Sequence, residues 1–472
     1  RVLDEAHKRD IKVIMDLVVN HTSDEHKWFE QSRDVHSPYH DYYVWRKGKA
    51  GGKRPPNNWL SCFEGGAWEQ DEKSKEYYLH VFAKEQPDLN HDNPKVREEV
   101  KDIMRFWLDM GVDGFREDVI TFISKKEGLP NGFPIPAACG IENYMDGPNI
   151  HKYLKEYREV TDQYDCFTVG EAPMMTPNNA LKYIDESNKE LDMMFHFQHI
   201  EADCFMVDYI QKKFDLRKMK RAFSSWQEKL RGRAWNTLYI ENHDHPRIIS
   251  RYGSERYRVE SGKMLANMYM LQQGTPFIYQ GQELGMLNIR HESLDDYVDV
   301  FMKNNYNVAV NKVRLNKDKA WDWAVRSTRD NSRTPVQWDD SDNAGFTSGT
   351  PWFPVNPNYK QINAKKEMED PNSILNHYKA LIKFKRENEV AIFGDYKEHY
   401  KNSDKLYVYE RNYLGKRLLV INSFSESTVP FEAPKGFNLE EGKPILCNYA
   451  NPTVQGNGFK LRPYETRVYV FE

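Results

Sequence analysis

Short apolar runs alternate with amphipathic segments along most of this chain, and the alternation limits the folds that it can adopt. Each run has the length of a buried strand and is bounded by polar residues. Six runs fit this description: Val13–Val19, 112–118, Phe167–Val169, Leu191–Phe195, Thr237–Ile240 and Pro276–Tyr279. Segments with helical spacing lie between them, so the sequence predicts a parallel β-sheet covered by helices.

Three of the intervening segments read as amphipathic helices. One starts at Asp92, Asn93 and Pro94, which are typical of a helix start. Its predicted apolar face comprises Val96, Val100, Ile103, Met104, Trp107 and Leu108. The other two helices are predicted at 149–163 and at Leu216–Leu230; their apolar faces comprise Ile150, Tyr153, Leu154 and Tyr157, and Met219, Phe223, Trp226 and Leu230.

A closed (β/α)₈ barrel needs eight strands, two more than the sequence shows. The chain opens RVLDEAHKRD, with Val2, Leu3 and Ala6 on one helical face, so residue 1 is expected to lie inside a helix. The expected fold is therefore an α/β TIM barrel whose first two strands precede residue 1. A chain that starts at Arg1 is expected to be inactive and poorly soluble, because strand edges would stay unpaired.

The barrel prediction divides the chain into four parts. Residues 1–21 begin the barrel, and 22–90 lack helical periodicity and are too long for a plain loop, which indicates an inserted subdomain. Residues 91–391 continue the barrel. Residues 392–472 read as short strands, two of them flanking Leu414 and Gly415, and predict a C-terminal antiparallel β-sandwich.

Composition excludes several classes of partner. The net charge is −4 and no long basic run occurs, which argues against nucleic acid or an anionic membrane as the partner. The five cysteines are scattered, odd in number and free of any CxxC pair, so neither a zinc site nor a disulfide framework is indicated. A cytoplasmic, monomeric protein is the expectation.

The stretch GFREDVI places two acids directly after an arginine, at the end of a predicted strand. Successive side chains of a strand alternate between its faces, so Arg116 and Asp118 share one face and Glu117 lies on the other. A guanidinium beside Asp118 would keep that carboxylate ionised, as a nucleophile requires. A structural salt bridge explains this motif alone equally well.

Polar residues also follow three other predicted strands. TVGEA places Glu171 after the strand near 167, ENHD places His243 and Asp244 after the strand near 237, and DLVVNH places Asp16, Asn20 and His21 at the end of the first strand. Active sites of barrel enzymes lie at the carboxyl ends of the strands. A polar cluster at four strand ends suits such a site better than it suits packing.

DLVVNH, GFREDVI, TVGEA and ENHD, in this order, resemble the four signature regions of glycoside hydrolase family 13, the α-amylase family. QPDLN at 86–90 and GTPFIYQGQELG at 274–285 resemble further regions, and RDNSRTPVQWDD at 329–340 resembles the oligo-1,6-glucosidase and α-glucosidase branch. The resemblance implies that Asp118 is the nucleophile, Glu171 the general acid/base and Asp244 the third acid. It further implies substrate contacts, which are assigned to Asp16, His21, Arg116, His243 and Arg329.

The function that the resemblance implies is a retaining exo-glucosidase for short α-1,6-linked glucosides such as isomaltose and panose. Relatives that favour α-1,6 bonds carry a valine after the nucleophile, as Val119 does here, whereas relatives that favour α-1,4 bonds tend to carry Ala or Thr. A maltase, a trehalose-6-phosphate hydrolase and a sucrose isomerase stay open as alternatives. A non-catalytic partner subunit of a membrane transporter is a further alternative, which loss of the catalytic acids would mark.

Three departures from the family pattern stand out. Glu117 occupies a position that is apolar in many relatives, and we expect it to be partly wet or paired with Lys or Arg. His245 replaces a common Gln; it could alter sugar contacts or pH response, or be a spectator. The family's first strands, with an Asp, a Tyr and a cation-binding loop, are expected before residue 1. No cofactor is expected, and a structural calcium ion would belong to that preceding part.

Overall fold

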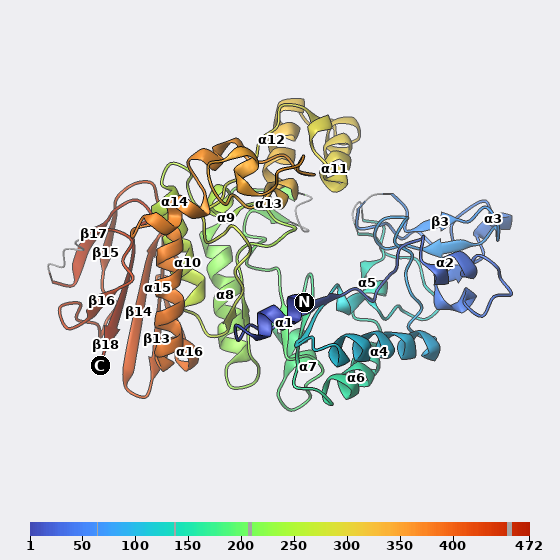
Figure 1. Ribbon diagram of the computed structural model, residues 1–472, viewed down its shortest axis with the longest axis horizontal. Helices are drawn as coiled ribbons and strands as arrows, with labels where there is room; N and C mark the ends of the chain where they lie inside the picture. The colour runs from blue at the N-terminus through green and yellow to red at the C-terminus, as the bar shows by residue number, and fades with distance from the viewer. Residues whose placement is uncertain (64, 136–137, 206–209, 451–455) are drawn as a thin grey trace. The chain divides into compact units, whose positions relative to one another are not determined.

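A computed structural model describes residues 1–472 apart from 64, 136–137, 206–209 and 451–455. The chain divides into two compact units, Arg1–Phe197 and Gln198–Glu472, and each is described by itself (Figure 1). The elements of the first unit are α1 Val2–His7, β1 Met15–Leu17, α2 Lys27–Ser32, η1 His40–Tyr42, β2 Trp45–Arg46, α3 Lys49–Gly52, β3 Trp68–Gln70, β4 Tyr77–Leu79, α4 Pro94–Asp109, β5 Gly114–Glu117, η2 Ile120–Phe122, α5 Ile141–Tyr144, α6 Ile150–Thr161, β6 Phe167–Glu171, α7 Pro177–Ile184 and β7 Met193–Phe195.

Strands β1, β5, β6 and β7 form a parallel sheet in this order, so neighbours in the sequence are neighbours in the sheet. Helices follow β5 and β6 and return the chain to the next strand, as the β-then-α pattern predicts. Gly114 permits the close approach of β5 and β6, because a Cβ atom there would lie 2.0 Å from the carbonyl oxygen of Phe167. The four predicted strands of this unit are confirmed.

Helix α4 shows how local sequence and packing combine. The side chain of Asn93 accepts a hydrogen bond from the Lys95 amide at 3.0 Å, and Pro94 occupies the first turn. Val96, Val100, Met104 and Leu108 of the predicted apolar face are buried. The prediction was wrong for Ile103, which is exposed, and Trp107 is only partly buried.

The region 22–90 contains a small antiparallel sheet of order β2-β4-β3. It also contains the short helices α2, α3 and η1, and the bounds of the inserted subdomain stay a prediction. Its aromatic residues form a buried cluster that includes Trp28, Phe29, Tyr43 and Tyr78. Aromatic packing, rather than regular secondary structure, therefore accounts for much of the order in this segment.

The elements of the second unit are β8 Cys204–Phe205, β9 Ile210–Gln211, α8 Leu216–Leu230, β10 Thr237–Leu238, α9 Ile248–Tyr252, α10 Arg258–Met270, β11 Thr275–Pro276, η3 Leu294–Asp296, α11 Val300–Asn311, α12 Lys317–Ser327, α13 Asp330–Arg333, η4 Asp342–Gly345, η5 Pro357–Lys360, α14 Ala364–Glu369, α15 Ile374–Glu387, α16 Glu389–Phe393, β12 Asp395–His399, β13 Leu406–Tyr413, β14 Lys416–Ser423, β15 Val429–Glu432, β16 Lys443–Ile445, β17 Gly458–Leu461 and β18 Thr466–Phe471. Strands β10 and β11 pair in parallel, which confirms the last two predicted strands.

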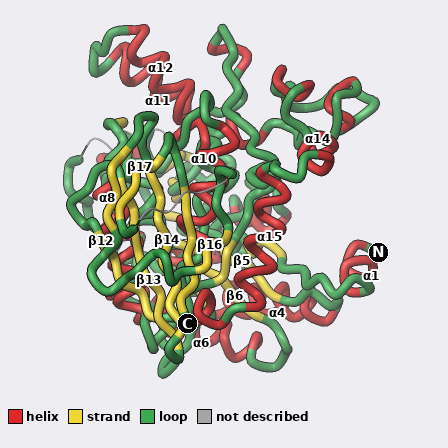
Figure 2. The backbone as a smooth tube through the Cα atoms, turned by 90° about the vertical axis from the view of Figure 1, so that its left-hand side faces the viewer, coloured by secondary structure: helices red, strands yellow, loops and turns green. Residues whose placement is uncertain are grey.

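The C-terminal strands form an antiparallel sheet of order β12-β13-β14-β18-β16 and a two-stranded sheet of β15 and β17 (Figure 2). A buried cluster joins residues of both sheets, among them Val408 and Ile421 of the larger sheet and Phe431 and Leu461 of the smaller one. The hairpin of β13 and β14 turns at Leu414 and Gly415, both with positive φ, as the sequence predicts.

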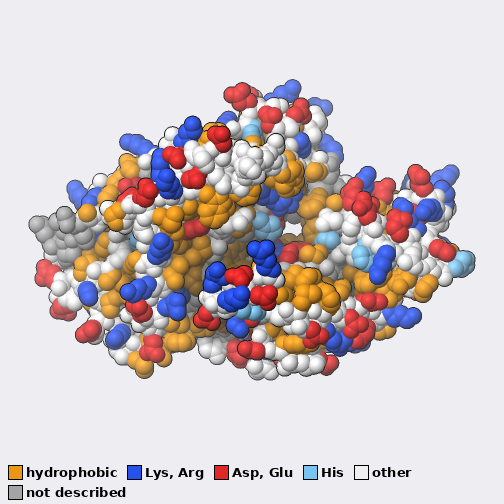
Figure 3. Space-filling view, viewed as in Figure 1, with side chains coloured by type: hydrophobic (Ala, Val, Ile, Leu, Met, Phe, Trp, Pro, Cys, Tyr) orange, Lys and Arg blue, Asp and Glu red, His pale blue; other side chains and the backbone are white. Residues whose placement is uncertain are grey.

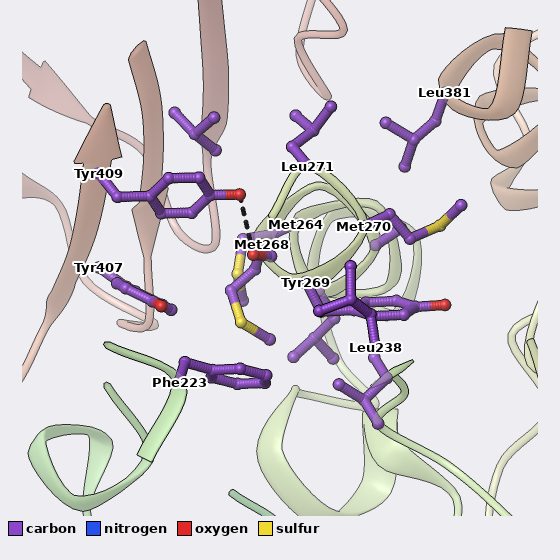
Figure 4. Close-up of a cluster of buried hydrophobic side chains, with 14 of the residues drawn as sticks. Phe223, Leu238, Met264, Met268, Tyr269, Met270, Leu271, Leu381, Tyr407 and Tyr409 are labelled. Carbon is purple, nitrogen blue, oxygen red and sulfur yellow. Dashed lines mark hydrogen bonds between the residues drawn. The ribbon is translucent and has the colours of Figure 1, made fainter. Parts of the chain in front are cut away.

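The core of the second unit extends from the helices into the antiparallel sheet. Figure 4 shows Phe223 of α8 and Met268 of α10 near Tyr407 and Tyr409 of β13, and Leu381 of α15 belongs to the same buried cluster. The hydroxyl of Tyr409 donates a hydrogen bond to the Met268 carbonyl at 3.0 Å. The C-terminal strands therefore share a core with the preceding helices, and the boundary at residue 392 stays a prediction.

On the face drawn in Figure 3, acidic and basic side chains are interspersed. No described helix has both the length and the apolar character needed to cross a membrane. The described residues also include no group of three or more His, Cys, Asp or Glu side chains that could hold a metal ion.

Candidate active site

The first unit brings Asp16, Arg116, Asp118 and Glu171 together at the carboxyl ends of adjacent strands. Asp16 pairs with Arg116 in the register of β1 and β5, and Glu117 pairs with Gly170 in the register of β5 and β6. Asp118 and Glu171 each follow directly in those strands. The adjacency of the two acids is thus a consequence of strand order and register.

The guanidinium of Arg116 contacts all three carboxylates. It donates from Nη1 to Asp16 Oδ1 at 2.8 Å and to Asp118 Oδ1 at 2.5 Å. Its Nη2 lies 2.8 Å from Glu171 Oε2. Burial alone would lower the pKa of Arg116, but the three carboxylates outweigh it and raise the pKa above its usual value. Arg116 therefore stays charged at neutral pH.

Glu117 lies on the opposite face of β5, as the strand alternation predicts, but its surroundings differ from the expectation. The residue is only 2% exposed, and its Oε2 has no hydrogen-bond partner among the residues that the structure describes. Burial, with a further contribution from Asp192, raises the pKa of Glu117 to about 8, against a lowering effect of Arg158. Glu117 is therefore a buried, neutral acid at neutral pH.

Glu117 is expected to make stability depend on pH. An acid whose pKa rises from about 4.5 in the unfolded chain to about 8 in the fold stabilises the protein below pH 4.5, and this stabilisation is lost as the pH rises through 8. Glu117→Gln should therefore raise the melting temperature relative to the parent protein progressively between pH 5 and 8, by an amount equivalent to a few kcal/mol.

The measurement is thermal unfolding by circular dichroism across this pH range, with the exposed Glu127→Gln as the matched control. A Glu117→Gln curve that runs parallel to the parent curve at every pH would mean that Glu117 does not change its protonation on folding.

The backbone turns sharply after Asp118. Val119 adopts a left-handed conformation, with φ 36° and ψ 41°, and η2 begins at the next residue. The turn aims the Val119 amide at Glu171 Oε2, at 3.2 Å. Glu171 Oε2 thus forms an ion pair with Arg116 and accepts a hydrogen bond from the Val119 amide, so its position depends on β5 and the turn that follows it.

The side chain of Val119 is 8% exposed and belongs to an apolar cluster. Its companions include Trp59 and Val81 of the inserted region and Phe122 and Tyr144 beyond the strand. A β-branched residue at positive φ is strained, so packing must hold it there. Its predicted role in linkage choice stays a prediction.

His21 is buried beside this group. Its Nε2 lies 3.0 Å from Gln86 Nε2, within the QPDLN motif, and its ring packs on Phe82 with centroids 5.3 Å apart. Burial lowers the pKa of His21, although Asp88 and Asp118 act in the opposite direction. At neutral pH the neutral imidazole is therefore favoured, which suits a hydrogen-bonding role.

Lys125 is a buried lysine that stabilises this region. No sequence pattern pointed to it. Lys125 Nζ lies 2.6 Å from Asp88 Oδ2 and donates to Asn20 Oδ1 at 2.9 Å. It joins the segment after β1, the QPDLN motif and the segment after β5. No short-range pattern could have identified it, because its partners lie far away in the sequence.

In the second unit, His243 and Asp244 lie in a loop that follows β10, five and six residues beyond its end. Arg333 donates to Asp244 Oδ1 at 2.7 Å and to the His243 carbonyl at 2.9 Å. Burial alone would raise the pKa of Asp244, but His243 and two arginines, Arg329 and Arg333, outweigh it and lower the pKa. Asp244 is thus held as a carboxylate.

The predicted residue Arg329 is more distant from Asp244, at 3.5 Å from Nη1 to Oδ1. Its guanidinium pairs with the buried Asp299 instead, with Nη2 3.0 Å from Oδ1. Sequence reasoning missed Arg333, although it stands four residues after Arg329 in the same RDNSRTP motif. That spacing was the available signal.

His245, the departure next to Asp244, is buried, and its Nδ1 lies 3.4 Å from Arg251 Nη1. Arg251 in turn pairs with Asp203 through two hydrogen bonds, at 2.8 and 2.7 Å. This contact with Arg251 gives His245 a place in a buried polar network.

The profile of the α-amylase catalytic domain matches residues 1–394, which contain all of these side chains. The chain belongs to glycoside hydrolase family 13, the α-amylase family. It is 47% identical over 476 residues to an oligo-1,6-glucosidase of Parageobacillus thermoglucosidasius, a match that covers 99% of this chain and 84% of the relative. Membership of the oligo-1,6-glucosidase and α-glucosidase branch follows.

Solved structures agree with this placement. The trehalose-6-phosphate hydrolase of Bacillus licheniformis superposes with a TM-score of 0.91 at 42% identity, covering 99% of this chain and 85% of that one. An isomaltulose synthase from Klebsiella sp. LX3 superposes with a TM-score of 0.94 at 38% identity, with coverages of 99% and 85%. The family 13 fold is a TIM barrel with a C-terminal antiparallel domain, which confirms the predicted fold class.

Proposed function

We propose that this family 13 enzyme is a retaining, exo-acting glucosidase that releases glucose from the non-reducing end of short α-1,6-linked gluco-oligosaccharides. The observation that carries the proposal is the single guanidinium, Arg116, that contacts Asp118 and Glu171 at the ends of adjacent strands. Neighbouring strands are about 4.8 Å apart. Carboxyl groups about 5 to 5.5 Å apart are typical of retaining enzymes.

In the proposed reaction, Asp118 attacks the anomeric carbon while Glu171 transfers its proton to the departing glycosidic oxygen. The bond to the leaving sugar breaks, and an ester between Asp118 and glucose forms. Glu171 then removes a proton from water, the water attacks the anomeric carbon, and Asp118 departs as a carboxylate. We assign Asp244 as the third acid, which grips sugar hydroxyls and supports distortion of the ring.

The contacts of Arg116 fit these roles. A cation beside Asp118 keeps the nucleophile ionised. The same cation favours ionised Glu171, which is the form that the second step needs. Once Asp118 is esterified, Arg116 loses one anionic partner. Its remaining contact with Glu171 then favours the carboxylate form that acts as the base. In the first step Glu171 must carry its proton, so substrate binding has to weaken its contact with Arg116.

The α-1,6 preference is supported by the oligo-1,6-glucosidase relative and by Val119. The similarity to a trehalose-6-phosphate hydrolase and to an isomaltulose synthase keeps hydrolysis of trehalose 6-phosphate and isomerisation of sucrose as alternative activities. A substrate profile must separate them from the α-1,6-glucosidase. The catalytic acids Asp118, Glu171 and Asp244 are all present, which argues against a non-catalytic transporter subunit. The proposal needs no cofactor. We further propose that the protein is monomeric and acts in the cytoplasm. The scattered, odd-numbered cysteines support the reducing compartment.

The test of the proposal is a substrate profile of the purified protein. Isomaltose and panose should be cleaved faster than maltose, sucrose and trehalose 6-phosphate, with glucose released first as the α-anomer. Preference for trehalose 6-phosphate, or conversion of sucrose to an isomer without net hydrolysis, would assign the corresponding alternative. Release of the β-anomer would contradict the retaining mechanism.

Val119→Ala is expected to raise turnover of maltose at least several-fold relative to isomaltose. Removal of two methyl groups beside the nucleophile gives an α-1,4-linked leaving sugar more room, and a change of this size is worth about 1 to 3 kcal/mol. The measurement is kcat/KM for both disaccharides. Leu129→Ala is the matched control, because Leu129 is buried to the same extent in the same cluster. An equal shift in both variants would indicate loosened packing rather than a specific role of Val119.

A further inference from the structure

The loop that carries Asp244 is closed by a buried ion pair. Glu241 stands before the loop and Arg247 after it, and Arg247 Nη1 donates to Glu241 Oε1 at 2.6 Å. The other oxygen of Glu241 accepts from the Ile248 amide at 3.0 Å. Both side chains are fully buried. The five residues 242–246, with His243 and Asp244 among them, therefore lie inside a loop whose two ends are tied together.

Arg247 also connects this loop to two other segments. Its Nη1 donates to the Gln280 carbonyl at 2.8 Å, and its Nη2 donates to the Ser332 carbonyl at 3.3 Å. Its guanidinium lies over the ring of Tyr279, 5.2 Å from the centroid. The hydroxyl of Tyr279 donates to the same Ser332 carbonyl at 3.0 Å. One side chain thus joins the loop after β10, the segment after β11 and helix α13.

The contact with Ser332 matters because the next residue is Arg333, which binds Asp244 and the His243 carbonyl. Arg247 holds the backbone on both sides of that interaction: the loop that presents Asp244 and the helix that presents Arg333. Within the loop, Asn242 Oδ1 accepts from the Asp244 amide at 2.9 Å. The carboxylate of Asp244 is therefore fixed by a short chain of contacts that starts at Arg247.

We infer that Glu241 and Arg247 are positioning residues that set the geometry of Asp244 and Arg333 for the reaction. This inference rests on the proposed role of Asp244 as the third acid. A buried ion pair adds little net stability compared with apolar packing, so stability alone is a weak reason for one at this place. Neither residue touches the sugar; each acts through the loop.

Arg247→Lys tests the inference. A lysine keeps the positive charge beside Glu241, but one ammonium group cannot reach Glu241, Gln280 and Ser332 in the planar geometry of a guanidinium. Displacement of a catalytic group by about 1 Å costs up to a hundredfold in rate, so kcat for an aryl α-glucoside should fall about ten- to a hundredfold, with a smaller change in KM. Glu241→Gln, which keeps the shape of the side chain, should shift kcat in the same direction.

Arg258→Lys is the matched control. Arg258 forms a comparable ion pair in the same unit, with Nη2 2.9 Å from Glu367 Oε1, and also donates to the Leu284 carbonyl at 2.9 Å. Loss of stability without loss of kcat is expected for this variant. Loss of stability with an unchanged kcat in Arg247→Lys as well would overturn the inference.

A double-mutant cycle with Asp244→Asn separates an effect of Arg247 through Asp244 from an independent effect of Arg247. If Arg247 acts through Asp244, Arg247→Lys lowers kcat in the parent protein but has no further effect in the Asp244→Asn background. Losses that multiply would show that Arg247 acts independently and would overturn the inference. Full activity of Asp244→Asn itself would instead refute the proposed role of Asp244.

Discussion

Asp118→Asn is expected to lower kcat by about three orders of magnitude or more, whereas Glu117→Gln retains at least about half of the parent activity. Both changes replace a carboxyl group by an amide of nearly the same shape, at adjacent positions at the end of β5. Only Asp118 lies on the face of Arg116, with which it forms a hydrogen bond of 2.5 Å. An amide there can neither attack the anomeric carbon nor depart from it as a stable anion.

The comparison is measured as kcat on isomaltose with both variants at one pH. Glu117→Gln serves as the internal control, since it removes the neighbouring acid without removing the proposed nucleophile. A slow substrate that leaves a labelled glycosyl-enzyme, mapped by mass spectrometry, identifies the residue directly. A label on Glu117 would contradict the assignment by strand face.

Glu171→Gln is expected to lower the rate on isomaltose by about two to four orders of magnitude, because the leaving sugar then departs without a proton. An aryl α-glucoside with an acidic phenol as leaving group needs no proton and should lose far less in its first step. The second step still lacks its base, so the glycosyl-enzyme on Asp118 should accumulate.

Stopped-flow release of the phenol measures this effect as a burst followed by a slow steady state. The exposed Glu127→Gln serves as the control and should show neither the rate loss nor the burst. An equal loss on isomaltose and on the aryl glucoside would mean that Glu171 does not protonate the leaving group.

The helices and strands that support the site follow from short-range patterns. The faces of α6 and α8 bury the residues that helical spacing selects, including Tyr153 and Phe223. The four predicted strands of the first unit and the two of the second unit pair in parallel, and alternation along β5 separates Arg116 and Asp118 from Glu117. Periods of 3.6 and 2 residues are properties of the backbone, so these features can be read without knowledge of distant neighbours.

The roles of the acids came from the four ordered motifs and their resemblance to family 13, because a salt bridge explained Arg116 and Asp118 equally well. The structure adds that one guanidinium reaches Asp16, Asp118 and Glu171. The register of β1, β5 and β6 makes this possible. Register is a relation between strands that lie about a hundred and fifty residues apart in the chain, and no single motif contains it.

Short-range patterns in the sequence were enough to predict the positions of the strands, the inward faces of two helices and the acid that shares a face with Arg116. The packing of distant segments buries Glu117, leaves its Oε2 without a hydrogen-bond partner among the described residues, exposes Ile103, and brings Arg333 closer to Asp244 than Arg329. The two groups of features differ because they depend on interactions of different range. Periodicity reflects the local backbone, whereas burial, pKa and ion pairing depend on which remote segments pack beside a side chain.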